Sequence, residues 1–119
     1  MTLVELTPQE VYDKLKAGEI VLIDVREPHE YALERVHGAL LHALSTFEPA
    51  AMPVGGPRQV VLHCARGGRS SKAVEACQAA GVPVDTHMAG GMIGWKEAGL
   101  PYARTDPSTG QLIDDGRGA

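Results

Sequence analysis

Cys64 is the residue of this sequence with the clearest capacity for chemistry. It follows the apolar segment 60–62 and His63 and opens a turn rich in glycine and arginine, residues 65–69, after which residues 70–74 have the composition of a helix. A strand, a turn and a helix in this order direct backbone N–H groups and the positive end of the helix dipole towards one point. A thiol at that point is predicted to be unusually acidic, and the thiolate is the form of cysteine that acts as a nucleophile.

The charges around Cys64 differ from those of the whole chain. The net charge is −4, which favours neither nucleic acid nor an anionic membrane as a partner. Between Glu48 and Glu75, however, the sequence contains no acidic residue, and its basic residues there are Arg58, Arg66, Arg69 and Lys72. A local positive charge in an acidic protein suits a small anionic substrate.

The spacing of the cysteine loop, residues 64–70, separates two kinds of chemistry. Cysteine-dependent phosphatases hold phosphate with a cysteine, five intervening residues and an arginine, whereas here Arg69 comes one residue earlier and Ser70 occupies the arginine position. The shorter loop suits a single sulfur atom bound to Cys64 better than a tetrahedral phosphate, which disfavours a phosphatase or an arsenate reductase. Cys64 can also be interpreted as a small buried apolar residue at a strand end, but that role requires neither the arginines nor the paired glycines beside it.

Strands and helices alternate along the chain, which indicates an α/β fold with a mainly parallel sheet of about five strands flanked by helices. The run 20–25 is almost continuously apolar, as in a strand covered on both faces. The expected strands are residues 3–6, 20–25, 39–43, 60–63 and 82–87; the expected helices are residues 8–17, 30–35, 69–80 and a segment that carries Ile93 and Trp95, with a helix or loop over residues 44–51.

The chain has the size and composition of one globular domain, with 119 residues, 44% of them hydrophobic and 22% charged. We expect the domain to cover residues 1–103 and residues 104–119 to form a polar tail that is poorly ordered or packed on the surface. The two cysteines do not make a disulfide framework. Because we find neither an apolar run long enough to span a bilayer nor an N-terminal signal region, we expect a cytoplasmic protein with no membrane partner.

Three motifs follow one another along the chain. The first is Cys64, Gly67, Arg69 and Ser70; the second is residues 23–28 with Glu30 and Tyr31; the third is Gly90, Gly91, Trp95 and residues 99–101. In this order they resemble the motifs of the single-domain rhodaneses, a sulfurtransferase family, over residues 3 to about 102 of this chain. The sequence departs from the family at residues 35–39, where His-Ile-Pro-Gly-Ala is usual, at Arg66, which the family does not require, and beyond Tyr102, where the family has no counterpart.

The resemblance implies a rhodanese-like fold and a two-step transfer of sulfur. The Cys64 thiolate would attack the outer sulfur of an anionic donor such as thiosulfate, release sulfite and become a persulfide, from which a thiol or cyanide would then take the sulfur. Arg66 and Arg69 would bind the anionic end of the donor, and no metal or organic cofactor is required. The persulfide would be held by the loop backbone: Ala65, Arg66, Gly67, Gly68, Arg69 and Ser70.

A second class of function remains open at this point. The same loop would serve a sulfur-carrier or sensor module, in which Cys64 receives sulfur from a partner protein or passes it to a sulfur-accepting protein. In such a module any turnover with free thiosulfate would be incidental. The sequence alone does not separate this module from an enzyme.

Other polar residues are assigned supporting roles. The resemblance places Asp24 and Arg26 in a polar network near the site, with Glu30 as a partner for Arg26, and we expect that network to be structural rather than catalytic. His63 should face away from Cys64 because successive residues of a strand point to opposite faces. Cys77 is predicted to be a core residue, because a helix from Arg69 rises about 12 Å before reaching it, further than a disulfide can span.

Overall fold

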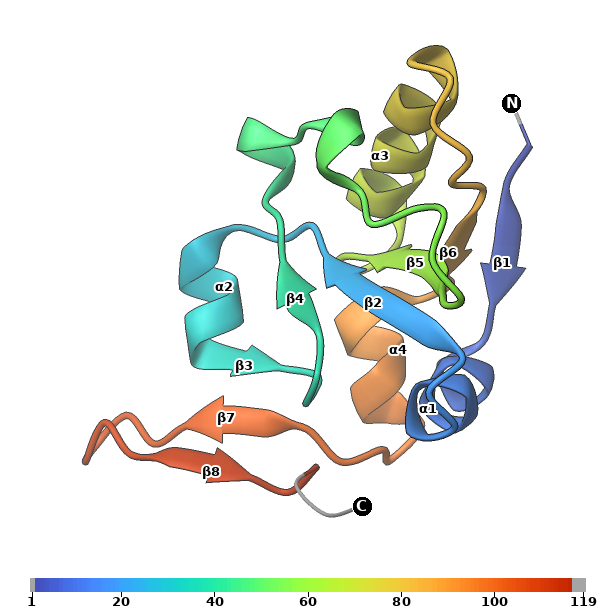
Figure 1. Ribbon diagram of the computed structural model, residues 1–119. Helices are drawn as coiled ribbons and strands as arrows, with labels where there is room; N and C mark the ends of the chain where they lie inside the picture. The colour runs from blue at the N-terminus through green and yellow to red at the C-terminus, as the bar shows by residue number, and fades with distance from the viewer. Residues whose placement is uncertain (1, 117–119) are drawn as a thin grey trace.

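A five-stranded parallel sheet runs through the middle of the molecule (Figure 1). All the pairings between its neighbouring strands are parallel. The α/β fold that the alternation of elements predicts is therefore confirmed. The computed structural model describes residues 2–116, and in sheet order the strands are β1 (Val4–Leu6), β6 (Thr86–Met88), β5 (Gln59–His63), β2 (Ile20–Asp24) and β4 (Leu40–Leu41).

The two central strands, β2 and β5, bring the site residues together. They pair in register from Ile20 opposite Gln59 to Asp24 opposite His63, and nearly all of their apolar residues are buried. Because parallel strands end at the same edge of a sheet, Asp24 lies beside His63, directly before Cys64. The helices α2 (Pro28–Leu33) and α3 (Gly68–Ala79) begin just beyond this edge, which is called the site edge below.

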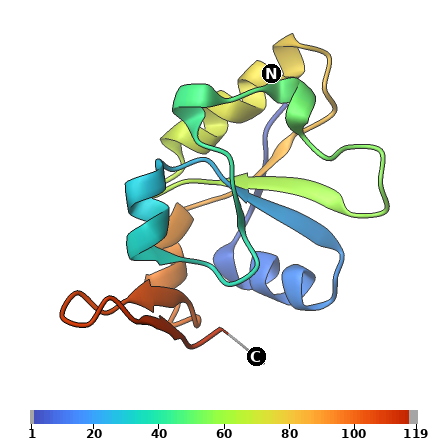
Figure 2. The ribbon, with the colours of Figure 1, turned by 60° about the vertical axis from the view of Figure 1, so that its left-hand side comes forward.

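Helices cover both faces of the sheet (Figure 2). One face packs against α1 (Pro8–Lys16) and α4 (Gly91–Glu97), with Trp95 in a core cluster between them and the strands. The other face packs against α3 and two short 3-10 helices, η1 (Leu44–Thr46) and η2 (Pro49–Ala51), around a second core cluster that includes Cys64 and Cys77. Cys77 is fully buried there, as the sequence predicts. Within residues 2–116, no helix is long and apolar enough to cross a membrane.

The C-terminal segment contains a regular element that the sequence does not predict. The sequence predicts a polar tail from residue 104, poorly ordered or packed on the surface, whereas the structure has a β-hairpin there, drawn in orange and red in Figure 1. Its strands, β7 (Ala103–Thr105) and β8 (Leu112–Asp114), pair antiparallel, and β7 also pairs with β3 (Glu34–Arg35) to give a second, three-stranded sheet. Strands of two or three residues are too short to show the alternation from which a strand is predicted.

Side-chain contacts hold this hairpin to the rest of the molecule. The Thr105 hydroxyl donates to the carbonyl oxygen of Ala32 at 2.7 Å, and His37 Nδ1 lies 2.6 Å from a carboxylate oxygen of Asp114. These pairs are 73 and 77 residues apart in the chain. No local sequence pattern could therefore predict these contacts.

Several element boundaries also differ from their predictions. The strand expected over residues 82–87 begins only at Thr86, because Pro83 has no N–H to donate and the N–H of Val84 bonds back to the carbonyl oxygen of Val82 at 2.8 Å. The helix expected over residues 30–35 ends at Leu33, and the strand expected over residues 39–43 is limited to Leu40–Leu41.

Candidate active site

Cys64 lies at the site edge, immediately after β5 and four residues before α3 begins. Only 1% of the residue is exposed. The backbone N–H of Gly67 donates to its sulfur, with 3.0 Å between nitrogen and sulfur. Gly67 has a φ of 122°, a backbone conformation that residues with a Cβ rarely adopt. The glycine therefore allows the loop to turn back over the thiol.

Ser70 stands on the other side of the thiol, in the first turn of α3. Its hydroxyl oxygen lies 3.5 Å from the sulfur of Cys64, and the residue is fully buried. Burial alone raises the pKa of Cys64, but hydrogen bonds from the Ser70 side chain and from the backbone N–H groups of Ser70, Gly67 and Arg66 outweigh it, so that the pKa is lowered. The cysteine loop is thus built to favour the thiolate.

The start of α4 holds the cysteine loop in place from the opposite side. The N–H of Met92 donates to the carbonyl oxygen of Cys64 at 2.8 Å, and the N–H of Ile93 donates to that of Ala65 at 3.1 Å. A Cβ atom on Gly91 would lie 2.3 Å from the carbonyl oxygen of Cys64, so only glycine permits this approach. Gly91 belongs to a motif noted in the sequence, but its contact with the cysteine loop becomes visible only in the structure.

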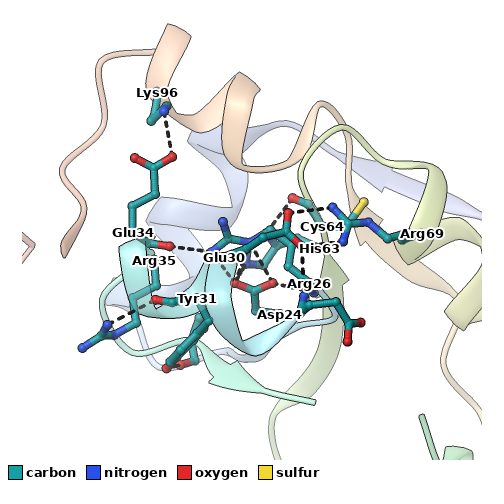
Figure 3. Close-up of polar contacts among 12 residues, drawn as sticks. Asp24, Arg26, Glu30, Tyr31, Glu34, Arg35, His63, Cys64, Arg69 and Lys96 are labelled. Atoms are coloured by element: carbon teal, nitrogen blue, oxygen red, sulfur yellow. Dashed lines mark hydrogen bonds and ion pairs between the residues drawn. The ribbon is translucent and has the colours of Figure 1, made fainter. Parts of the chain in front are cut away.

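Arg69 forms an ion pair with Glu30 of α2 (Figure 3). Both its terminal nitrogens donate to the carboxylate, at 2.6 and 2.9 Å, and this contact is the main reason that the pKa of Glu30 falls to about 2. The sequence prediction that Glu30 pairs with Arg26 is therefore wrong: the start of α3 brings Arg69 to α2, and Arg26 has another partner. The pair ties α3 to α2 and offsets the positive charge of Arg69.

The partner of Arg26 is Asp24, at the end of β2. The two side chains are joined by several hydrogen bonds, the shortest of 2.8 Å between Arg26 Nη2 and Asp24 Oδ2. Both are buried, with Asp24 at 0% and Arg26 at 3% exposure. Arg26 Nη2 also donates to the carbonyl oxygen of Glu34 at 2.6 Å. The pair therefore fixes the chain that leaves β2 (Figure 3).

His63 connects this pair to the back of the cysteine loop. Its Nδ1 lies 3.1 Å from the carbonyl oxygen of Cys64, and its Nε2 lies 3.5 Å from Asp24 Oδ2. Burial lowers the pKa of His63, which keeps the imidazole neutral despite the nearby carboxylate. The contact of His63 with Cys64 is to the backbone and not to the thiol, which fits a structural role for Asp24 and Arg26.

The remaining residues of the cysteine loop lie nearer to the solvent. Arg66 and Gly68 are exposed, and Ala65 is partly buried. Beside Ala65 a cavity of about 410 Å³ opens between α2 and α4, lined by apolar side chains together with Arg26, Glu30 and Glu34. In residues 2–116 no group of three or more His, Cys, Asp or Glu side chains is placed to bind a metal ion.

Two residues that sequence reasoning missed complete the surroundings of the thiol. His87 of β6 has its Nδ1 2.7 Å from the hydroxyl oxygen of Ser70, and its Nε2 lies 2.9 Å from a carboxylate oxygen of Glu5 on β1. Glu5 and His87 are register partners in the parallel pairing of β1 with β6. Because Glu5 and His87 are 82 residues apart in the chain, the sequence gives no local signal for their contact.

The fold and this loop define an α/β domain with a hydrogen-bonded cysteine at the carboxyl edge of a parallel sheet. The chain belongs to the rhodanese-like domain family, whose family model matches residues 7–98. It is 34% identical over 104 residues to an uncharacterized protein of Synechocystis sp., covering 87% of this chain and 58% of that protein. It is 35% identical over 101 residues to the probable adenylyltransferase/sulfurtransferase MoeZ of Mycobacterium tuberculosis, covering 81% of this chain and 25% of that protein. The chain thus spans less than two thirds of either relative.

A solved structure gives the same assignment. The crystal structure of a thiosulfate sulfurtransferase from Pseudomonas aeruginosa is similar over 95% of this chain and 20% of that one, with a TM-score of 0.73 and 26% sequence identity. The rhodanese fold expected from the sequence motifs is therefore confirmed.

Proposed function

We propose that this protein is a sulfurtransferase that carries sulfane sulfur as a persulfide on Cys64. The observation that carries the proposal is the surroundings of the thiol: the Gly67 N–H at 3.0 Å, the Ser70 hydroxyl at 3.5 Å and a lowered pKa. Such surroundings stabilise negative charge on sulfur, which both steps of a sulfur transfer require. Family membership and the relatives named as sulfurtransferases support the same assignment.

In the first step, the Cys64 thiolate attacks the outer sulfur of thiosulfate. A new S–S bond forms to Cys64 while the S–S bond of the donor breaks, and its electron pair leaves with sulfite. In the second step, a thiol or cyanide attacks the outer sulfur of the persulfide, and the Cys64 thiolate leaves. The N–H of Gly67 and the hydroxyl of Ser70 then stabilise the charge that returns to the sulfur. This chemistry requires no metal or organic cofactor.

Formation of the persulfide can be tested by the intact mass of the protein. After incubation with thiosulfate, the mass should rise by one sulfur atom, and the gain should disappear when cyanide is added. The Cys64→Ser variant should show no gain. The Cys77→Ser variant is the matched control and should keep it, since Cys77 is fully buried in the core. A persulfide that depends on Cys77, or none on either cysteine, would refute the proposal.

Binding of the anionic donor should depend on Arg66 more than on Arg69. Arg66 is exposed on the cysteine loop, whereas Arg69 is paired with Glu30. A charge-assisted contact from Arg66 to thiosulfate predicts that Arg66→Ala slows persulfide formation about tenfold. The loss should shrink as ionic strength rises, because salt screens exposed charges. Stopped-flow kinetics with thiosulfate would measure it.

Arg104→Ala is the matched control for this measurement, because Arg104 is an exposed arginine on the second sheet. It should leave the rate unchanged. Equal rates for the native protein and for Arg66→Ala would show that the loop N–H groups bind the donor without Arg66.

A sulfur-carrier module is the second candidate. The observation that favours it is the match to a quarter of MoeZ, a relative named both adenylyltransferase and sulfurtransferase, in which such a domain is joined to other sequence. A carrier should accept sulfur from a protein persulfide faster than from thiosulfate. Comparing the two donors at equal concentration by intact mass would separate the candidates. The short cysteine loop continues to disfavour a phosphatase or an arsenate reductase.

A further inference from the structure

Four side chains form a continuous line from the thiol to the surface. Cys64 Sγ lies 3.5 Å from Ser70 Oγ, which lies 2.7 Å from His87 Nδ1, and His87 Nε2 lies 2.9 Å from Glu5 Oε2. The first three residues are buried, with Cys64 at 1%, Ser70 at 0% and His87 at 2% exposure, whereas the Glu5 side chain is 59% exposed. The line thus begins in the site and ends in solvent.

The fold holds this line in place from several elements. Cys64 ends β5, Ser70 belongs to the first turn of α3, His87 lies on β6 and Glu5 on β1. The pairing of Glu5 with His87 in the sheet puts the two side chains on the same face. A Cβ on Gly67 would come within 3.6 Å of His87 Cε1, so the imidazole also packs against the cysteine loop.

The proton positions follow from the partners. His87 Nε2 faces a carboxylate oxygen, which calls for a hydrogen on that nitrogen, so in the ring form with a single N–H the Nδ1 is an acceptor. The Ser70 hydroxyl then donates to Nδ1, since that contact of 2.7 Å is shorter than the 3.2 Å to its other acceptor, the carbonyl oxygen of Gly67. The lone pairs of Ser70 are left free to accept the S–H of Cys64.

We propose that His87, oriented by Glu5, takes up the proton of the Cys64 thiol through the hydroxyl of Ser70. The S–H bond of Cys64 breaks as an O–H bond forms on Ser70, while the original O–H bond of Ser70 breaks as an N–H bond forms on His87 Nδ1. The products are a thiolate and an imidazolium whose other N–H faces the Glu5 carboxylate. No electrons are exchanged, and Ser70 ends with one proton, as it began.

The transfer reverses the hydrogen bonds so that they favour the thiolate. After it, His87 Nδ1 donates to Ser70, and the Ser70 hydroxyl donates to the sulfur. His87 is therefore a positioning residue, because it acts on the sulfur through Ser70. The role of this proton transfer in catalysis rests on the proposed function, since both sulfur-transfer steps involve the Cys64 thiolate. Cys64 and Glu5 from β1 are the other titratable groups of the line, and the charge of Arg69 from α3 acts on Cys64 from outside it.

The test is a pH titration of the thiolate by its ultraviolet absorbance. It uses a Cys77→Ser background, in which Cys64 is the single thiol, and subtracts a variant that lacks both cysteines. His87→Asn is the decisive substitution, because asparagine places an amide near the position of Nδ1 but cannot take up a proton. The titration midpoint of Cys64 should rise by about one pH unit in this variant. If His87 merely filled space and bonded to Ser70, the asparagine would leave the midpoint unchanged.

Glu5→Gln supplies an independent variant that the fold should tolerate, because the Glu5 side chain is largely exposed. It should raise the midpoint in the same direction by a smaller amount, since the amide keeps the contact but loses the charge that stabilises the imidazolium. Unchanged midpoints in both variants would overturn the proposal, and the Glu5 variant alone decides if His87→Asn does not fold. The titration needs no sulfur donor. A shifted midpoint without any persulfide would thus support the proton transfer and refute the proposed sulfurtransferase. A persulfide with unchanged midpoints would support the sulfurtransferase and refute the proton transfer.

Discussion

Replacing Gly91 with alanine should destabilise the protein by about 3 kcal/mol or more and disorganise the cysteine loop. The new Cβ would lie 2.3 Å from the carbonyl oxygen of Cys64 and 2.6 Å from the carbonyl carbon of Ala65. These are backbone atoms, so no side chain can turn aside to make room. Gly91 also has a φ of 56°, which adds backbone strain to the clash. Urea unfolding followed by circular dichroism would measure the loss.

Gly94→Ala is the matched control, because Gly94 lies in the same helix. A Cβ there would meet its nearest neighbour, Pro8 Cγ, at 3.5 Å, which is an ordinary contact. Its free energy of unfolding should stay within about 1 kcal/mol of the native value, since alanine is the better helix former. The Gly91 variant should also accumulate less persulfide. A Gly91 variant as stable as the Gly94 variant would contradict the role assigned to this close approach.

The parts of the structure that could be predicted are those encoded locally. Thr7 and Glu10 form the reciprocal hydrogen bonds of a capping box, at 3.1 and 3.0 Å, and α1 begins between them as their spacing predicts. The apolar run of β2, residues 20–23, becomes a buried central strand. Residues 60–70 contain a strand, a turn and the start of a helix in sequence, so the placement of Cys64 at the end of β5 followed from neighbours in the chain.

The parts that could not be predicted depend on contacts between distant segments. Arg69 and Glu30 are 39 residues apart, and His87 and Glu5 are 82 apart. The sequence predicts that Arg26 pairs with Glu30, because the two residues are close in the chain. In the structure Arg26 pairs with Asp24, and Glu30 pairs with Arg69 at the start of α3. The hairpin of β7 and β8 escaped prediction for the same reason, because β7 pairs with the distant two-residue strand β3.

Replacing Asp24 with alanine should cost about 3–5 kcal/mol of folding free energy, because it leaves the guanidinium of Arg26 buried without its carboxylate. Arg26 is only 3% exposed, so its charge is almost entirely shielded from water. Its remaining acceptor is the carbonyl oxygen of Glu34, which carries no full charge. The thermal midpoint and the urea midpoint should both fall, and persulfide formation should weaken because β2 adjoins His63 and the cysteine loop.

Two further variants distinguish a buried charge from a merely lost contact. Lys96→Ala breaks the ion pair of Lys96 with Glu34, whose side chains are 38% and 30% exposed, and it should cost less than about 1 kcal/mol. Adding Arg26→Met to Asp24→Ala removes the unpaired charge and should restore part of the stability, so the two substitutions should not be additive. A double variant less stable than Asp24→Ala alone would show that Arg26 stabilises the site edge by its packing, and not through its pairing with Asp24.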